Sequence, residues 1–208
     1  MPRTVCNRSS LLGGKSSRRF ASKGVELLKI KRNSLLQELG TAQSELSEMD
    51  RLLAEGRKNA VQSLILALAI DGCVSLDLTS AELKSRLDLE LLSRNTWGVR
   101  FPVIAKLEHA KYDHSNAGAV STRTSAAREE FVEFVDLLIR RSALWIKVMR
   151  LKRELDRTSR RLNALTHTFI PAMDREIRYI ELILESRELE NIVRQKNTKK
   201  RKTRHESC

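Results

Sequence analysis

The chain has 208 residues, nine of them aromatic, with 31% charged residues and a formal net charge of +13. This composition, with only 8 glycines and 3 prolines, is typical of long helices exposed to water and excludes neither one domain nor two. The longest apolar run, Leu64 to Ile70, is far shorter than the ~20 residues that cross a bilayer. The first residues lack the apolar core of a signal peptide. We therefore expect a cytoplasmic protein without a membrane span.

The positive charge is concentrated at both ends of the chain. Residues 1–23 carry six lysines and arginines and no acidic residue, and residues 191–208 carry a further net charge of +6. The middle is close to neutral, so we expect any electrostatic partner to meet the two ends.

A heptad pattern dominates the first third of the chain. Apolar and small residues recur mostly at steps of three and four, with one slip near Gly56: Leu28, Leu35, Leu39, Ala42, Leu46, Met49, Leu53, Gly56, Ala60, Leu64 and Ala67. This spacing predicts a coiled-coil helix over residues 20–70. Residues 1–19 are expected to form a basic segment in which Gly13 and Gly14 fray the helix start.

The central segment, residues 71–125, changes period. Leu87, Leu89 and Leu91 alternate with acidic residues, Ser93 to Thr96 offers turn residues, and alternation resumes from Trp97. The pattern predicts a β-hairpin over about residues 86–103, with a helix over residues 81–92 as the alternative. Residues 111–125 are small and polar and predict a flexible loop.

Residues 126–193 are predicted to form the second helix, followed by a basic tail over residues 194–208. Pro171 lacks the amide that would bond the carbonyl of His167, which predicts a kink there. The expected stripe consists of Phe131, Val135, Leu138, Trp145, Val148, Leu151, Leu155, Leu162, Leu165, Phe169, Met173, Ile177, Ile180 and Leu184. The fold class that follows is all-α dominated: a long antiparallel two-helix coiled coil with a small central β-hairpin. The alternative is that each stripe is the core face of a bundle helix.

Candidate catalytic chemistry is weak throughout. The run from Gly13 to Ser16 is similar to the end of a phosphate-binding loop, but Ser9 stands where that motif needs glycine. His109 and His114 lack ligand partners at metal-site spacing, and Cys73 reads as a small buried hydrophobe. We predict no catalytic, cofactor-binding or metal-binding residue, and therefore a protein that is not an enzyme.

Three segments resemble the D subunit of the V/A-type (vacuolar/archaeal-type) ATPases and ATP synthases, in its bacterial form. The run from Arg160 to Leu165 is followed by an Ile-Pro pair and an Ile-x-Tyr-Ile run, a Leu-Leu-Lys-x-Lys-Arg segment stands near the start, and Val99 to Ile104 is similar to one arm of the family's hairpin. The residues that carry the match are Leu28, Lys29, Lys31, Arg32, Arg161, Asn163, Ala164, Leu165, Pro171 and Tyr179.

The resemblance implies a central-stalk rotor shaft without cofactor. Its expected partners are the A and B subunits, the F subunit and a membrane-side socket subunit, and it would couple ATP hydrolysis or synthesis to H+ or Na+ transport. We expect the basic ends to meet acidic loops of the A/B ring through Arg18, Arg19, Lys23, Arg194 and Lys196. The charge pattern leaves two alternatives: a coiled coil that binds nucleic acid through phosphates, or a generic scaffold.

Overall fold

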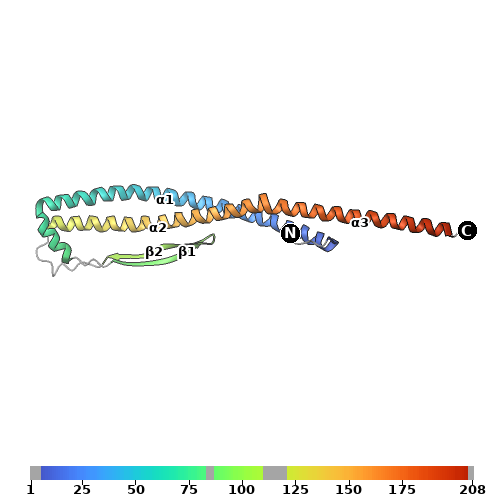
Figure 1. The fold of residues 1–208 in the computed structure, drawn as a ribbon. Helices are drawn as coiled ribbons and strands as arrows, with labels where there is room; N and C mark the ends of the chain where they lie inside the picture. Colours follow the sequence, from blue (N-terminus) through green and yellow to red (C-terminus); the bar gives the residue numbers. More distant parts are fainter. Residues whose placement is uncertain (1–5, 83–86, 110–120, 206–208) are drawn as a thin grey trace. The chain divides into compact units, whose positions relative to one another are not determined.

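The computed structural model describes residues 6–82, 87–109 and 121–205 of the chain. Its elements, in order, are α1 (Arg8–Glu82), β1 (Leu87–Thr96), β2 (Val99–His109), α2 (Thr122–Ala164), the π-helical turn η1 (Leu165–Phe169) and α3 (Ile170–His205) (Figure 1). This confirms the predicted fold class, two long antiparallel helical segments with a two-stranded sheet between them. The chain divides into two compact units, which we call unit 1 (residues 1–32 and 157–208) and unit 2 (residues 33–156).

The helices extend beyond their predicted bounds. Helix α1 begins at Arg8, where the Asn7 side chain caps it by accepting a 2.6 Å hydrogen bond from the Ser10 amide, so residues 8–19 are helical. It continues past residue 70 to Glu82, interrupted by Gly72 (φ 76°, ψ 163°), which marks a kink between two helical pieces. Residues 122–125, predicted as loop, belong to α2, and the tail is helical as far as His205. Residues 111–120 of the predicted loop lie outside the described residues.

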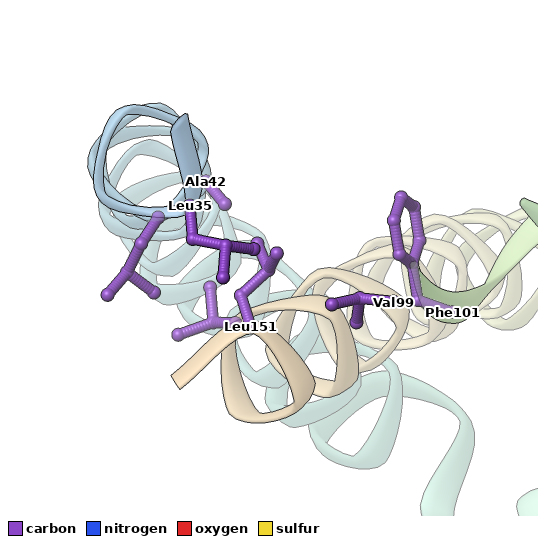
Figure 2. Close-up of a cluster of buried hydrophobic side chains, with 7 residues drawn as sticks. Leu35, Ala42, Val99, Phe101 and Leu151 are labelled. Carbon is purple, nitrogen blue, oxygen red and sulfur yellow. The ribbon is translucent and has the colours of Figure 1, made fainter. Parts of the chain in front are cut away.

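The predicted stripe of α1 is confirmed along its length. Every position from Leu28 to Ala67 in that stripe is buried or half-buried, and Leu35, Ala42 and Ala67 are 0% exposed. Figure 2 shows Leu35 and Ala42 pointing toward Leu151 of α2, which is also fully buried. Each such leucine contributes about 1.5–3 kcal/mol through removal of apolar surface from water.

The predicted stripe of α2 is wrong at three of its first four positions, although Phe131 is half-buried as predicted. Val135, Leu138 and Trp145 are 38%, 43% and 46% exposed, whereas Leu137 and Leu144, each one residue earlier than a predicted position, are half-buried. The reason is that α2 is apolar on several sides between residues 131 and 149, so periodicity alone does not identify the side that faces α1. From Val148 to Leu162 the predicted phase holds.

A π-turn changes the phase again before Pro171. The Ile170 amide donates to the carbonyl of Leu165, five residues back instead of four. We call the stripe of buried and half-buried residues that faces the other helix the seam. Because of the π-turn, the seam continues from Leu165 to Ile170. Phe169, the predicted stripe residue, is 51% exposed. The structure thus places a wider helical turn immediately before the proline, whose ring cannot donate a backbone hydrogen bond.

The β-hairpin turns at Trp97 and Gly98. Both residues have positive φ, 53° and 83°, as a two-residue type I′ turn requires, and Thr96 pairs with Val99 across it. The predicted turn over Ser93 to Thr96 is wrong, since these residues belong to β1, and β2 continues beyond residue 103 to His109. Residues 87–92 are strand, so the helical alternative fails for them.

The turn end of β2 packs against both helices of unit 2. Val99 and Phe101 are buried with the Leu35 cluster (Figure 2). The Lys147 ammonium lies 5.6 Å from the centroid of the Phe101 ring and 3.8 Å from carboxylates of both Glu38 and Glu45 on α1. Nearby, the Arg150 guanidinium donates a 2.6 Å hydrogen bond to the carbonyl of Arg100.

Candidate functional site

Among the described residues, the segments considered for nucleotide or metal binding do not form such sites. Gly13 to Ser16 lie inside α1, so they do not form a phosphate-binding loop. Within residues 6–82, 87–109 and 121–205, no group of three or more His, Cys, Asp or Glu side chains could hold a metal ion. Cys73 is exposed, so the prediction that it is a buried hydrophobe is wrong.

Charge distinguishes the two units sharply. Unit 1 contains 22 lysines and arginines against 8 acidic residues, a net charge of +14, and unit 2 contains 17 against 18, a net charge of −1. The excess positive charge of the whole chain therefore lies in the unit that contains both chain ends. Unit 1 is the candidate site for an acidic partner.

Ion pairs join α1 and α3 along unit 1. Arg8 meets Glu188 at 2.6 Å and Lys15 meets Glu181 at 2.7 Å, seven residues along each helix in opposite directions, and a third pair joins Arg18 and Asp174. These side chains are between about a third and four-fifths exposed, so each pair contributes only ~0–1 kcal/mol. Their role is to favour the antiparallel alignment.

The two helices approach closely between these pairs. At Gly14, an added Cβ atom would lie 3.2 Å from Cγ1 of Ile177, which is closer than ordinary van der Waals contact. The glycine that was expected to fray the helix therefore permits helix packing.

The five basic residues predicted to contact a partner ring differ in their surroundings. Arg18 donates to the Asp174 carboxylate, so its charge is partly neutralised inside the chain. Arg19 and Lys23 are exposed on α1, and Arg194 and Lys196 are exposed on α3. Contact of these residues with a ring of partner subunits stays a prediction.

Sequence reasoning missed an exposed apolar face in unit 1. Phe20 and Leu27 on α1 are 80% and 67% exposed, and Phe169 and Tyr179 on the η1–α3 segment are 51% and 61% exposed. Each directly precedes a buried or half-buried seam residue, so helix geometry turns all four toward one side of an antiparallel pair. An aromatic face of this kind is typical of protein–protein contact.

The residues that suggested a family are distributed between the seam and the surface. Leu28, Lys31, Arg32, Leu165 and Pro171 are half-buried, whereas Lys29, Arg161, Asn163, Ala164 and Tyr179 are exposed. The residues of the first group lie in the interface between the helices or at its edge. The second group is available to other proteins.

Comparison with known proteins decides the family. The family model described as the D subunit of ATP synthase matches residues 10–200. The chain belongs to this D-subunit family. The D subunit of the A-type ATP synthase of Pyrococcus furiosus is 34% identical over 196 residues, covering 92% of this chain and 91% of the relative. The D subunit of the V-type ATP synthase of Anaeromyxobacter is 32% identical over 213 residues, covering 100% and 98%.

This D subunit is a component of a rotary ATP synthase or ATPase, and it acts with other subunits of that complex. Among the helices of the described residues, none combines the length and the apolar character needed to cross a membrane.

Proposed function

We propose that this D subunit is the non-catalytic central shaft of a V/A-type ATPase or ATP synthase. In this role ATP is bound and converted at interfaces between A and B subunits, and the shaft couples those events to H+ or Na+ movement through a membrane ring. The observation that supports it best is the charge division in a family member: a net +14 on the unit with both chain ends, against −1 on the other.

The proposal assigns different partners to the two units. Unit 1, with its basic surface and exposed aromatic face, meets the A and B subunits. Unit 2, which carries the β-hairpin, lies on the side of the F subunit and the membrane-side socket subunit. The complex is cytoplasmic and peripheral to the membrane.

A basic surface suits a part that must move past its neighbours. Attraction between exposed charges extends over roughly 8 Å at physiological ionic strength and does not require one fitted geometry. Each exposed pair contributes only about 0–1 kcal/mol, so single contacts can break and reform as the shaft turns. The sum over several charges still holds the shaft inside the ring.

Charge-neutral substitutions test this assignment. The test variant replaces two arginines and two lysines of unit 1, Arg19, Lys23, Arg194 and Lys196, with glutamine, leaving the paired Arg18 in place. We expect its affinity for an A/B ring to fall at least about tenfold at low salt and to depend less on salt than that of the unchanged chain.

A matched control removes the same charges from unit 2. Its substitutions are at the exposed residues Arg57, Lys58, Lys152 and Arg153, again two arginines and two lysines. Equal loss of ring affinity in both variants would refute the assignment. A titration with labelled duplex and single-stranded DNA tests the alternative, because strong salt-dependent binding there with none to the ring would indicate a nucleic-acid partner.

A further inference from the structure

A cavity of about 430 Å³ lies between the β-hairpin and the two helices of unit 2. Its lining comes from α1, from both strands of the hairpin and from α2, and every lining residue belongs to unit 2. Binding sites for small molecules typically enclose about 300–1,000 Å³. The cavity therefore has the size of a small-molecule site.

The hairpin is built so that the cavity stays open beside it. Phe101 is 5% exposed, whereas Val103, two residues along the same strand, is 36% exposed. Ala105 is an extra residue of β2 at the register shift, and the lining on this strand ends at the preceding residue, Ile104. A bulge of this kind bends a strand, so β2 changes direction directly after the cavity.

Much of the cavity wall is apolar. Three elements contribute to this part: Met49 on α1, Phe101, Val103 and Ile104 on β2, and Ala143 and Leu144 on α2. Methionine adapts its shape to what it contacts, and removal of such surfaces from water favours an apolar ligand. The wall therefore suits a ligand with an apolar body.

The charged groups of the cavity leave an excess of positive charge. The Lys147 ammonium lies 3.8 Å from carboxylates of both Glu38 and Glu45, and its side chain is only 17% exposed. Arg94 and Arg140 also line the cavity, and in the described part of the chain neither guanidinium forms an ion pair. Three cations against two carboxylates give the lining a net charge of +1. The group that is missing is an anion.

We propose that this cavity binds a small amphiphilic carboxylate, a monocarboxylic acid with an apolar chain such as a medium-chain fatty acid. Its carboxylate accepts hydrogen bonds from the guanidiniums of Arg94 and Arg140, and its chain packs against the apolar wall. A cationic ligand would meet three cations, and an anion without a chain would leave the wall in water. The proposal goes beyond the shaft role and does not depend on it.

The bound acid would hold the hairpin against the helices. Arg94 lies on β1 and pairs directly with Phe101, so both side chains lie on the same face of the hairpin, whereas Arg140 lies on α2. The complete site therefore exists only while the hairpin is docked. A ligand that binds one state alone, at a hundred times its Kd, favours that state by about a hundredfold.

Decanoate is the probe that tests the proposal on the unchanged full chain. Hydrogen exchange of β1 and β2 is measured at increasing decanoate concentrations below those at which micelles form. We expect amide protection of both strands to rise, and the midpoint of the rise gives the affinity. Decanol, which lacks the carboxylate, should bind at least about tenfold more weakly. Octanoate, shorter by two methylene groups, should bind about tenfold more weakly.

Two matched double variants test the residues of the site. Arg94→Gln with Arg140→Gln removes both guanidiniums from the cavity, and Arg100→Gln with Arg153→Gln replaces exposed arginines of β2 and α2 that do not line it. Without decanoate, both variants should protect the hairpin as the unchanged chain does, because all four side chains are exposed. We expect the cavity variant to bind decanoate at least about tenfold more weakly and the control variant to bind it unchanged.

The peptides of unit 1 report adventitious binding, since its net charge of +14 attracts any anion. A decanoate effect confined to those peptides, with no rise in hairpin protection, would overturn the proposal. Equal decanoate affinity in the two variants would do so as well, and so would decanol binding as tightly as decanoate.

Discussion

Replacing Phe101 with alanine is expected to release the β-hairpin from the helices of unit 2. Phe101 is only 5% exposed, and its ring both joins the Leu35 cluster and lies under the Lys147 ammonium. Truncating a buried phenylalanine costs roughly 3–5 kcal/mol. Because 1.4 kcal/mol corresponds to a factor of about ten, amide protection of β1 and β2 should fall about a hundredfold or more. Hydrogen exchange followed by mass spectrometry measures this loss of amide protection for each peptide.

The helices serve as the internal reference. Protection of α1 and α2 outside the contact should change little, since Leu35 and Leu151 remain packed without the hairpin. Val103→Ala is the matched control, because Val103 lies on the same strand but is 36% exposed. The reasoning is refuted if the hairpin keeps its protection in Phe101→Ala, or if both helices open together with it.

Four further substitutions test three local features. Gly24→Ala should raise the free energy of unfolding by up to about 1 kcal/mol in thermal unfolding, because nothing lies within 4 Å of the added Cβ atom. Gly14→Ala should stabilise the chain by at least about 0.5 kcal/mol less, because its added Cβ atom meets the facing helix. Trp97→Asn should strengthen the hairpin by about 1 kcal/mol in hydrogen exchange, because asparagine tolerates positive φ better. Thr124→Val removes the 2.7 Å bond to Asp71 and should cost about 1 kcal/mol in urea unfolding.

The sequence was most informative where only one side of a helix is apolar. In α1, leucines and alanines at heptad steps are flanked by charged residues, and the observed burial follows them from Leu35 to Ala67. In α2 the same periodicity favours Trp145 over Leu144, because both lie on apolar sides of the helix. The π-turn was not predictable either, since it adds one residue per turn without any change in composition. The hairpin turn was misplaced because tryptophan rarely occupies a position with positive φ.

The candidate site was foreseeable in its charge but not in its contacts. Basic residues at both chain ends are visible in the sequence, and the antiparallel fold brings them into one unit. That Arg18 is paired with Asp174 while Arg19 is exposed depends on the helical rotation of two distant segments, which no local pattern specifies. The exposed Phe20 and Tyr179 could have been found by marking the residues that precede each seam position.

The π-turn before Pro171 is a site where the chain can lose one residue with little loss of helix packing. Deleting one residue within an ordinary stretch of α3 would rotate everything beyond it by about 100° and move Ile177 and Ile180 out of the interface. Deleting one residue within Leu165–Phe169 would convert the wide turn to a regular one and leave the later part of the helix in phase with its partner. Tolerance to single-residue deletion should therefore peak at this turn.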